Sequence, residues 1–142
     1  MTDHITIAID AMGGENSPNK TIKGISHHLK NSNKIFYLIF GNEKLIHPLI
    51  EKYKINSDKF KIIHTEKIIE DTDTALGAAK KGKDTSLWLA MESLKKGESD
   101  CVVSAGNTGA LFVIAKLNLE MITNIEKPAL SALWPNKSGM NV

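Results

Sequence analysis

Cysteine is nearly absent from this chain of 142 residues, in which Cys101 is the single thiol. One thiol cannot form an internal disulfide, so we expect a reducing compartment, the cytoplasm. Residues 1–4 lead into the first apolar run without the charged lead and apolar stretch of a signal peptide, and none is predicted. At the start of a buried strand, Cys101 is expected to be a small core residue and not a nucleophile.

An excess of charge is also lacking. Eighteen lysine and arginine residues against sixteen aspartates and glutamates leave a formal net charge of +2, and no basic block occurs along the chain. The sequence therefore does not carry the electrostatic footprint of a nucleic-acid-binding protein. The longest apolar helical pattern, over 110–122, is interrupted by Lys116, Asn118 and Glu120 and is too short to span a bilayer.

Signatures of metal and cofactor sites are missing as well. The five histidines show no metal-ligand spacing, and the adjacent His27 and His28 cannot share one helix face. No G-x-G-x-x-G pattern follows the first strand, which argues against a nucleotide cofactor. The sequence therefore predicts neither a metal ion nor a cofactor.

The composition is that of one globular domain over residues 1–142, because 42% hydrophobic and 24% charged residues lie near the average for such proteins. Short apolar runs alternate with helical patterns, which favours an α/β fold with a three-layer, mostly parallel sheet. Strands are expected at residues 5–9, 34–40, 60–64, 101–103 and 129–134. Helices are expected after Ser17, after Asn42, over 75–81, between Ser86 and Gly97, and over 108–122.

Local signals set expectations for three helices. Ser17 is predicted to cap the first helix, with Pro18 as its first residue. Asn42 is predicted to cap the second, and Pro48 to kink it or delay its start. The pattern over 108–122 is apolar around most of its circumference, which predicts a buried helix.

The chain is organised around the stretch from Asp100 to Ala110, in which a short apolar strand meets a glycine-flanked polar turn and then a long apolar helix pattern. Gly106 and Gly109 let the backbone turn sharply, and Asn107 or Thr108 can cap the helix. The first N–H groups of a helix lack intrahelical partners and carry the positive end of its dipole, which suits a phosphate or oxyanion. An ordinary strand-to-helix connection that binds nothing fits these residues equally well.

Two further polar turns are expected at the same edge of the sheet. Asp10 follows the first strand, and Gly13 and Gly14 leave room for a ligand, although Asp10 can equally be a turn or cap residue. The segment from Lys83 to Ser86 is a polar, partly basic helix start. Ligands of open α/β sheets bind at the carboxyl ends of the strands, so three such turns together predict a phosphate-type site.

Four segments carry a family resemblance: IAIDAMGG at 7–14, KDTS at 83–86, VSAGNTGA at 103–110 and KPAL at 127–130. In this order they resemble the signature segments of the bacterial phosphate acyltransferase (PlsX) family, over essentially the whole chain. Family members are considerably longer, so the resemblance is to their amino-terminal part. Gly82 in a usually more basic run, and Thr85 in place of a more usual serine, are mild departures.

The resemblance implies a fold similar to that of isocitrate and isopropylmalate dehydrogenases. It also implies a function. Members of this family transfer a fatty acyl group from acyl carrier protein to orthophosphate, giving acyl phosphate for phospholipid synthesis, with no cofactor. They are described as homodimers that can associate with the membrane surface, so a cytoplasmic enzyme, peripheral at the membrane, is expected.

Orthophosphate is a competent nucleophile near neutral pH, so its attack on a thioester needs positioning and charge stabilisation more than a strong base. The backbone N–H groups from Ala105 to Gly109 are expected to hold phosphate or the developing oxyanion. Ser86, Ser104, Asn107 and Thr108 would add donors, Lys83 would add a positive charge, and Asp10 would orient Lys83 or a backbone turn. The expected catalytic residues are Lys83 and Asn107; the expected substrate-binding residues are Asp10, Gly13, Gly14, Asp84, Ser86, Ser104, Ala105, Gly106, Thr108 and Gly109.

Two other interpretations stay open. One is a phosphotransacetylase-like, CoA-dependent acyltransferase or a dehydrogenase-like protein of the same broad fold. The other is a partner-binding or structural fragment without catalytic activity.

Overall fold

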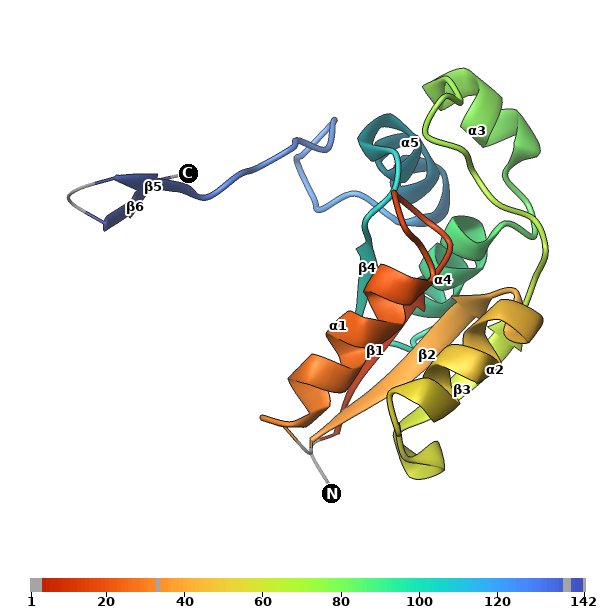
Figure 1. Cartoon of the computed structure of the whole chain (residues 1–142). Helices are drawn as coiled ribbons and strands as arrows, with labels where there is room; N and C mark the ends of the chain where they lie inside the picture. The colour runs from red at the N-terminus through yellow and green to blue at the C-terminus, as the bar shows by residue number, and fades with distance from the viewer. Residues whose placement is uncertain (1–3, 33, 137–138, 142) are drawn as a thin grey trace.

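The computed structural model describes residues 4–32, 34–136 and 139–141. Its main sheet consists of four parallel strands in the order β3-β2-β1-β4, namely β1 (Ile5–Asp10), β2 (Ile35–Gly41), β3 (Phe60–His64) and β4 (Cys101–Ser104). The helices are α1 (Asn19–Leu29), α2 (Glu43–Lys52), the short 3-10 helix η1 (Ser57–Lys59), α3 (Ala75–Lys81), α4 (Ser86–Lys95) and α5 (Thr108–Asn118). The predicted three-layer α/β fold with a mostly parallel sheet is confirmed (Figure 1).

Helices cover both faces of the sheet (Figure 1). On one face α1 and α2 pack against β1 and β2, where Ile22 contacts the cluster that contains Ile9 and Ile39. On the other face α4 packs through Ala90 against a cluster that contains Ala8. Side chains alternate between the two faces of a strand, so the continuous apolar runs of β1 and β2 supply both of these cores.

The starts of the first two helices differ in part from the prediction. Pro18 occupies the N-cap position of α1, and the Ser17 hydroxyl donates to the Gly13 carbonyl at 2.5 Å instead of capping the helix. In α2, Asn42 is the cap, as predicted, and accepts the Lys44 N–H. The expected late start is wrong, because α2 begins at Glu43 and Pro48 lies inside it.

Helix α5 is shorter and more exposed than the sequence predicts. It ends at Asn118, and only one side of it, with Ala110 and Ile114, is buried against α3 and α4. Leu117 on the other side is 56% exposed. The prediction of a buried helix over 108–122 is therefore wrong, because no described element covers the second side.

The edge position of β4 explains another wrong prediction. In the described sheet β4 pairs with β1 alone, and α1 does not extend over it, so Cys101 is exposed and Val103 is 50% exposed. Cys101 is not a core residue, because a strand buries both of its faces only when elements cover both of them.

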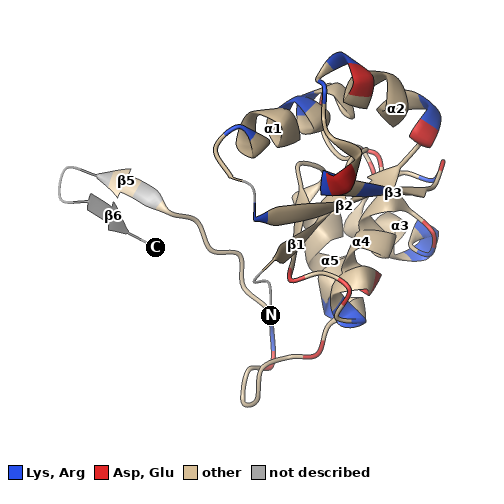
Figure 2. Cartoon of the chain, turned by 90° about the horizontal axis from the view of Figure 1, so that it is seen from below, with Lys and Arg blue, Asp and Glu red and all other residues tan. Residues whose placement is uncertain are grey.

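The fifth strand is not found at 129–134. Residues 126–133 have no regular structure, and β5 (Trp134–Asn136) and β6 (Gly139–Asn141) form an antiparallel hairpin that extends away from the main sheet (Figure 1). Residues 128–133, which lead directly to this hairpin, carry no charged side chain (Figure 2). This segment has residues that favour strands, but a strand also needs a neighbouring strand to pair with. In the described structure no strand of the main sheet lies beside it.

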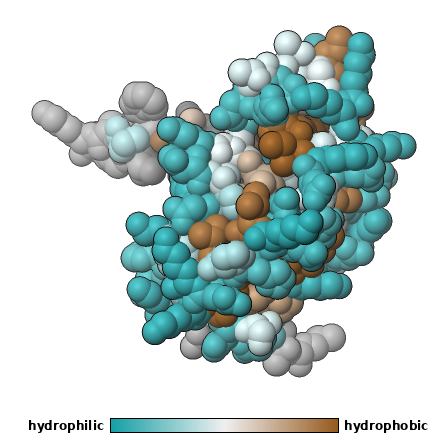
Figure 3. Space-filling view, turned by 45° about the vertical axis from the view of Figure 1, so that its right-hand side comes forward, coloured by the Kyte–Doolittle hydropathy of each residue, from teal (hydrophilic) through white to brown (hydrophobic). Residues whose placement is uncertain are grey.

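The surface is mixed in character. Lysines and acidic residues are dispersed over the helices, and neither sign dominates the view in Figure 2. On the face shown in Figure 3, apolar patches lie between hydrophilic residues. None of the helices in the described part of the chain has the length and hydrophobicity that a membrane span requires.

The sheet core predicts a large contrast between two identical substitutions. Ile39→Ala removes a side chain with no solvent exposure and is expected to lower the free energy of unfolding by about 2–5 kcal/mol. Ile122→Ala removes a side chain that is 79% exposed and is expected to change it by less than about 0.5 kcal/mol. Urea unfolding followed by circular dichroism measures both, and similar losses would contradict the core described above.

Candidate functional site

The carboxylate of Asp10 connects the three predicted turns. Asp10 ends β1 and is 3% exposed. Its Oδ1 accepts the Ser86 hydroxyl at 2.6 Å, and its Oδ2 accepts the Ser104 hydroxyl at 2.7 Å. Ser86 is the first residue of α4 and Ser104 the last of β4. Residues that are 76 and 94 positions away from Asp10 therefore meet at one buried group, and the three turns converge.

The turn after β1 lies directly against the turn after β4, and both ribbons meet at the same end of the sheet (Figure 1). Gly14 has a φ of +84°, and a Cβ there would lie 2.1 Å from the Ala105 carbonyl oxygen. A Cβ on Gly13 would lie 2.4 Å from Oδ2 of Asp10 and 3.0 Å from the Gly106 nitrogen. In the structure these two glycines make room for the neighbouring turn. That they also leave room for a ligand stays a prediction.

The turn before α5 uses some of its amides internally and leaves others open. The Gly106 N–H donates to the Ser104 hydroxyl oxygen at 3.2 Å, and the Ala110 N–H donates to Oδ1 of Asn107, the predicted cap, at 3.0 Å. The N–H groups of Thr108 and Gly109, the first two residues of α5, have no acceptor among the described residues. Both residues are exposed, so these two amides are accessible to an anion.

The side chain of Asn107 is occupied on both sides. Its Nδ2 donates to the backbone carbonyls of Asp71 and Asp73, at 3.1 and 2.8 Å. Asp73 also pairs with Lys81 at 2.7 Å, and this contact lowers the pKa of the Asp73 carboxyl and raises the pKa of the Lys81 ammonium. The sequence predicted a surface loop here and missed its contact with the α5 start, because backbone carbonyls leave no signature in a sequence.

Lys83 and Asp84 are not brought to the Asp10 carboxylate. Lys83 is exposed and lines a hollow along α4 that Trp88 also lines. Asp84 is exposed and pairs with Lys67 at 2.9 Å. Within the described residues Asp10 does not contact Lys83. Its Oδ1 accepts the Met12 N–H at 3.3 Å, a contact that agrees with the alternative expectation that Asp10 orients a backbone turn.

Some polar groups of the site are hydrogen-bonded to each other, and others are open. Ser86 and Ser104 each have one hydroxyl hydrogen and donate it to Asp10, so neither has a hydrogen left for an anion in this arrangement. The open donors are the Thr108 and Gly109 amides at the positive end of α5. The residues that the structure describes contain no group of three or more His, Cys, Asp or Glu side chains suited to a metal ion.

The contact between the two turns can be tested at two glycines with similar backbones. Gly14 and Gly97 both have a positive φ, of +84° and +72°, so alanine is strained at each, by about 1–2 kcal/mol. A Cβ at Gly97 meets nothing within 4 Å, whereas one at Gly14 meets Ala105. Gly14→Ala is expected to lower the free energy of unfolding by about 1–3 kcal/mol more than Gly97→Ala. Equal losses in urea unfolding would contradict the close approach.

The Asp10 carboxylate can be tested by an isosteric change. Asp10→Asn replaces one carboxylate oxygen by an NH₂ group, so the hydroxyl of Ser86 or Ser104 faces a donor instead of an acceptor. The free energy of unfolding is expected to fall by about 1–3 kcal/mol. Asp71→Asn makes the same change on an exposed side chain and is expected to be nearly neutral. A double-mutant cycle of Asp10→Asn with Ser104→Ala should show a coupling energy; strict additivity would mean that the two side chains do not interact.

Comparison with known proteins gives consistent matches along the chain. A family model described as "Fatty acid synthesis protein" matches residues 5–142. The chain is similar to the phosphate acyltransferase of Pelagibacter ubique, with 56% identity over 142 residues that cover all of this chain and 42% of that protein. It is also similar to the phosphate acyltransferases of Parvibaculum lavamentivorans and Maricaulis maris, with 42% identity over 143 and 39% over 144 residues.

The matches cover only part of the length of each relative. It spans only 40–42% of the length of these three curated relatives, although all of its own length is aligned. The family that the four sequence segments indicated is thereby confirmed. On these grounds the chain belongs to the fatty acid synthesis protein family, whose relatives named above are phosphate acyltransferases.

Proposed function

We propose that residues 1–142 form a single α/β domain that supplies the phosphate-binding part of a phosphate acyltransferase. The reaction is the transfer of a fatty acyl group from acyl carrier protein to orthophosphate, which gives acyl phosphate for phospholipid synthesis. Family membership and the names of the relatives support the reaction class. The observation that carries the proposal is the convergence of three turns on Asp10 beside the two open amides of α5.

In this proposal the Thr108 and Gly109 amides and the Thr108 hydroxyl hold an oxygen of phosphate or of the tetrahedral intermediate. The positive end of α5 stabilises negative charge there without a metal ion. Asp10, Ser86 and Ser104 act as positioning residues, because the two serine hydroxyls donate their hydrogens to the Asp10 carboxylate.

Asn107 is also proposed as a positioning residue. It caps α5 and holds the carbonyls of Asp71 and Asp73 close to the helix start. Lys83 and Asp84 lie on the turn that carries Ser86 and act at longer range in this proposal, Lys83 through its positive charge. Gly13, Gly14, Ala105 and Gly106 shape the backbone that these groups share.

The chemical step needs no cofactor and no covalent enzyme intermediate. A phosphate oxygen attacks the thioester carbonyl carbon, the carbonyl oxygen becomes an oxyanion, and the C–S bond then breaks. The thiolate of the carrier leaves and takes up a proton from solvent. Positioning and charge stabilisation supply the rate enhancement, because phosphate is already an adequate nucleophile.

The assembly and location follow from the resemblance and are part of the proposal. We propose a cytoplasmic homodimer that associates peripherally with the membrane surface. The exposed apolar side of α5 and the exposed apolar residues that follow it support an extended contact surface, since large apolar patches mark interaction sites.

The role of the open amide can be tested by two substitutions at one position. Thr108→Ala removes only the hydroxyl, whereas Thr108→Pro also removes the N–H, and proline is tolerated at the first helical position. The backbone of Asn107, with φ −59° and ψ 115°, lies outside the α region, which a residue before proline avoids. Phosphate affinity, measured by calorimetry, is expected to fall about tenfold further in Thr108→Pro than in Thr108→Ala. Equal affinities of the two variants would refute the amide contact.

The reaction itself is tested by incubating the chain with acyl-acyl carrier protein and phosphate and trapping acyl phosphate with hydroxylamine. Phosphate-dependent product is expected. Product that instead requires coenzyme A would favour the phosphotransacetylase-like alternative. A folded chain that binds phosphate and makes no product would favour a non-catalytic fragment.

A further inference from the structure

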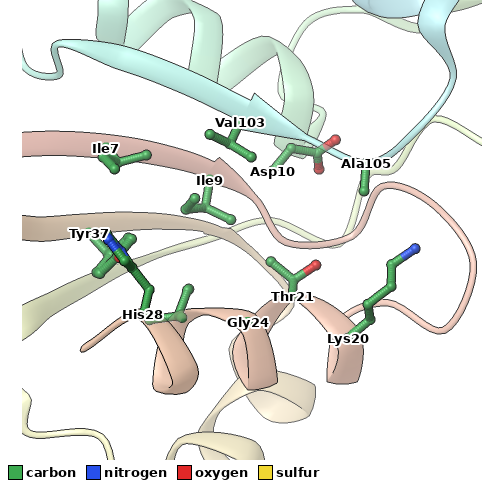
Figure 4. Close-up of a pocket in the computed structure, with 11 residues that line it drawn as sticks. Ile7, Ile9, Asp10, Lys20, Thr21, Gly24, His28, Tyr37, Val103 and Ala105 are labelled. Atoms are coloured by element: carbon green, nitrogen blue, oxygen red, sulfur yellow. The ribbon is translucent and has the colours of Figure 1, made fainter. Parts of the chain in front are cut away.

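An apolar groove begins at the candidate site and runs along α1. It has a volume of about 300 Å³ and lies between α1 and the sheet (Figure 4). Ile7 and Ile9 of β1 and Val103 of β4 form its floor. Ile9 is buried, whereas Val103 on the edge strand β4 is 50% exposed, so the groove is open on the side of β4.

One end of the groove is polar and shares residues with the site. Asp10 and Ala105 lie at this end, and Lys20 of α1 extends its ammonium group toward the same end (Figure 4). Among the described residues Lys20 is exposed and has no acidic partner. A positive charge therefore lies where the apolar groove meets the phosphate-type rim.

His28 and Tyr37 lie at the other end (Figure 4), and the Nδ1 of His28 is 2.5 Å from the hydroxyl of Tyr37. From Lys20 to His28 helix α1 rises by about 12 Å, which is the length of a medium alkyl chain. Gly24 lies midway along this wall, and a Cβ there would meet nothing within 4 Å. The missing side chain keeps the groove open, although glycine weakens the helix interior by about 1 kcal/mol relative to alanine.

We propose that this groove receives the acyl chain of the substrate, with the reacting carbonyl at the end where Asp10 and Ala105 lie and the methyl end toward His28 and Tyr37. The proposal rests on the proposed function, which makes the substrate a fatty acyl thioester. Its support is the order of surfaces: the ammonium group of Lys20 at one end, then an aliphatic floor, then His28 and Tyr37. An anionic head with an apolar tail matches this order, because polar groups stay paired while methylene groups are buried.

Alkylphosphonates are suitable probes, because they join a phosphate-like head to an alkyl chain and do not react. The 142-residue chain is titrated by calorimetry with inorganic phosphate, methylphosphonate, butylphosphonate and octylphosphonate below their aggregation concentrations. The affinity is expected to rise about two- to fourfold for each methylene that enters the groove.

Gly24→Phe fills the groove and should abolish the gain with chain length, leaving the affinities for phosphate and methylphosphonate unchanged. Lys23→Phe is the matched control, because it adds the same side chain at an exposed neighbouring position that does not line the groove. It should keep the full gain. Circular dichroism melting curves establish that both variants are folded.

The outcomes separate the groove from the proposed function. If the head group binds but octylphosphonate gains nothing, or if the gain persists in Gly24→Phe, the groove proposal is overturned and the phosphate site stands. If phosphate does not bind but octylphosphonate does, and Gly24→Phe alone removes this binding, the groove stands and the proposed function fails. If none of the probes binds, both fail. Sedimentation that shows a dimer disrupted by Gly24→Phe would assign the groove to a second copy of the chain and overturn the proposal.

Discussion

A buried carboxylate with two serine hydroxyls on its two oxygens is the constraint on which the site depends. Burying a charged group costs several kcal/mol unless hydrogen bonds replace its hydration, and Asp10 receives donors from α4, β4 and its own turn. The loss of any one donor would leave a buried charge less well solvated. The hydrogen bonds to Asp10 therefore hold these three segments together. The close packing of Gly13 and Gly14 on the neighbouring turn follows from this arrangement.

This constraint divides the polar groups of the site into two kinds. The serine hydroxyls donate to Asp10, while the first two amides of α5 have no acceptor among the described residues. Asn107 adds a second tie, because it holds the loop before α3 against the start of α5. Internal hydrogen bonds beside open donors suit a reaction that depends on positioning, since donors held in place in advance need little reorganisation. The apolar groove then continues from this rim along α1.

Much of the fold could be predicted from the sequence because its signals are local. The strands at Ile5–Asp10 and Phe60–His64 follow from short β-branched runs, and Asn42 and Asn107 cap helices as their side chains allow. Three of the errors have one cause. Cys101, the outer side of α5 and residues 129–133 have the apolar character of buried segments, but burial depends on a neighbouring element, and no described element covers them. The periodicity of one segment cannot reveal whether another segment packs on it.

The sequence by itself determined the alternation of strands and helices, the parallel sheet, and the three polar turns at its carboxyl edge, because hydrophobic period and turn residues act within a few positions. Only the tertiary structure decided which side chains of those turns meet. Ser86 and not Lys83 reaches Asp10, because the first residue of α4 faces the sheet while Lys83 lies on the exposed turn before it. Which side chain contacts Asp10 depends on the position of α4 relative to β1, and Ser86 is 76 residues away from Asp10 in the sequence. A local sequence pattern cannot predict this contact.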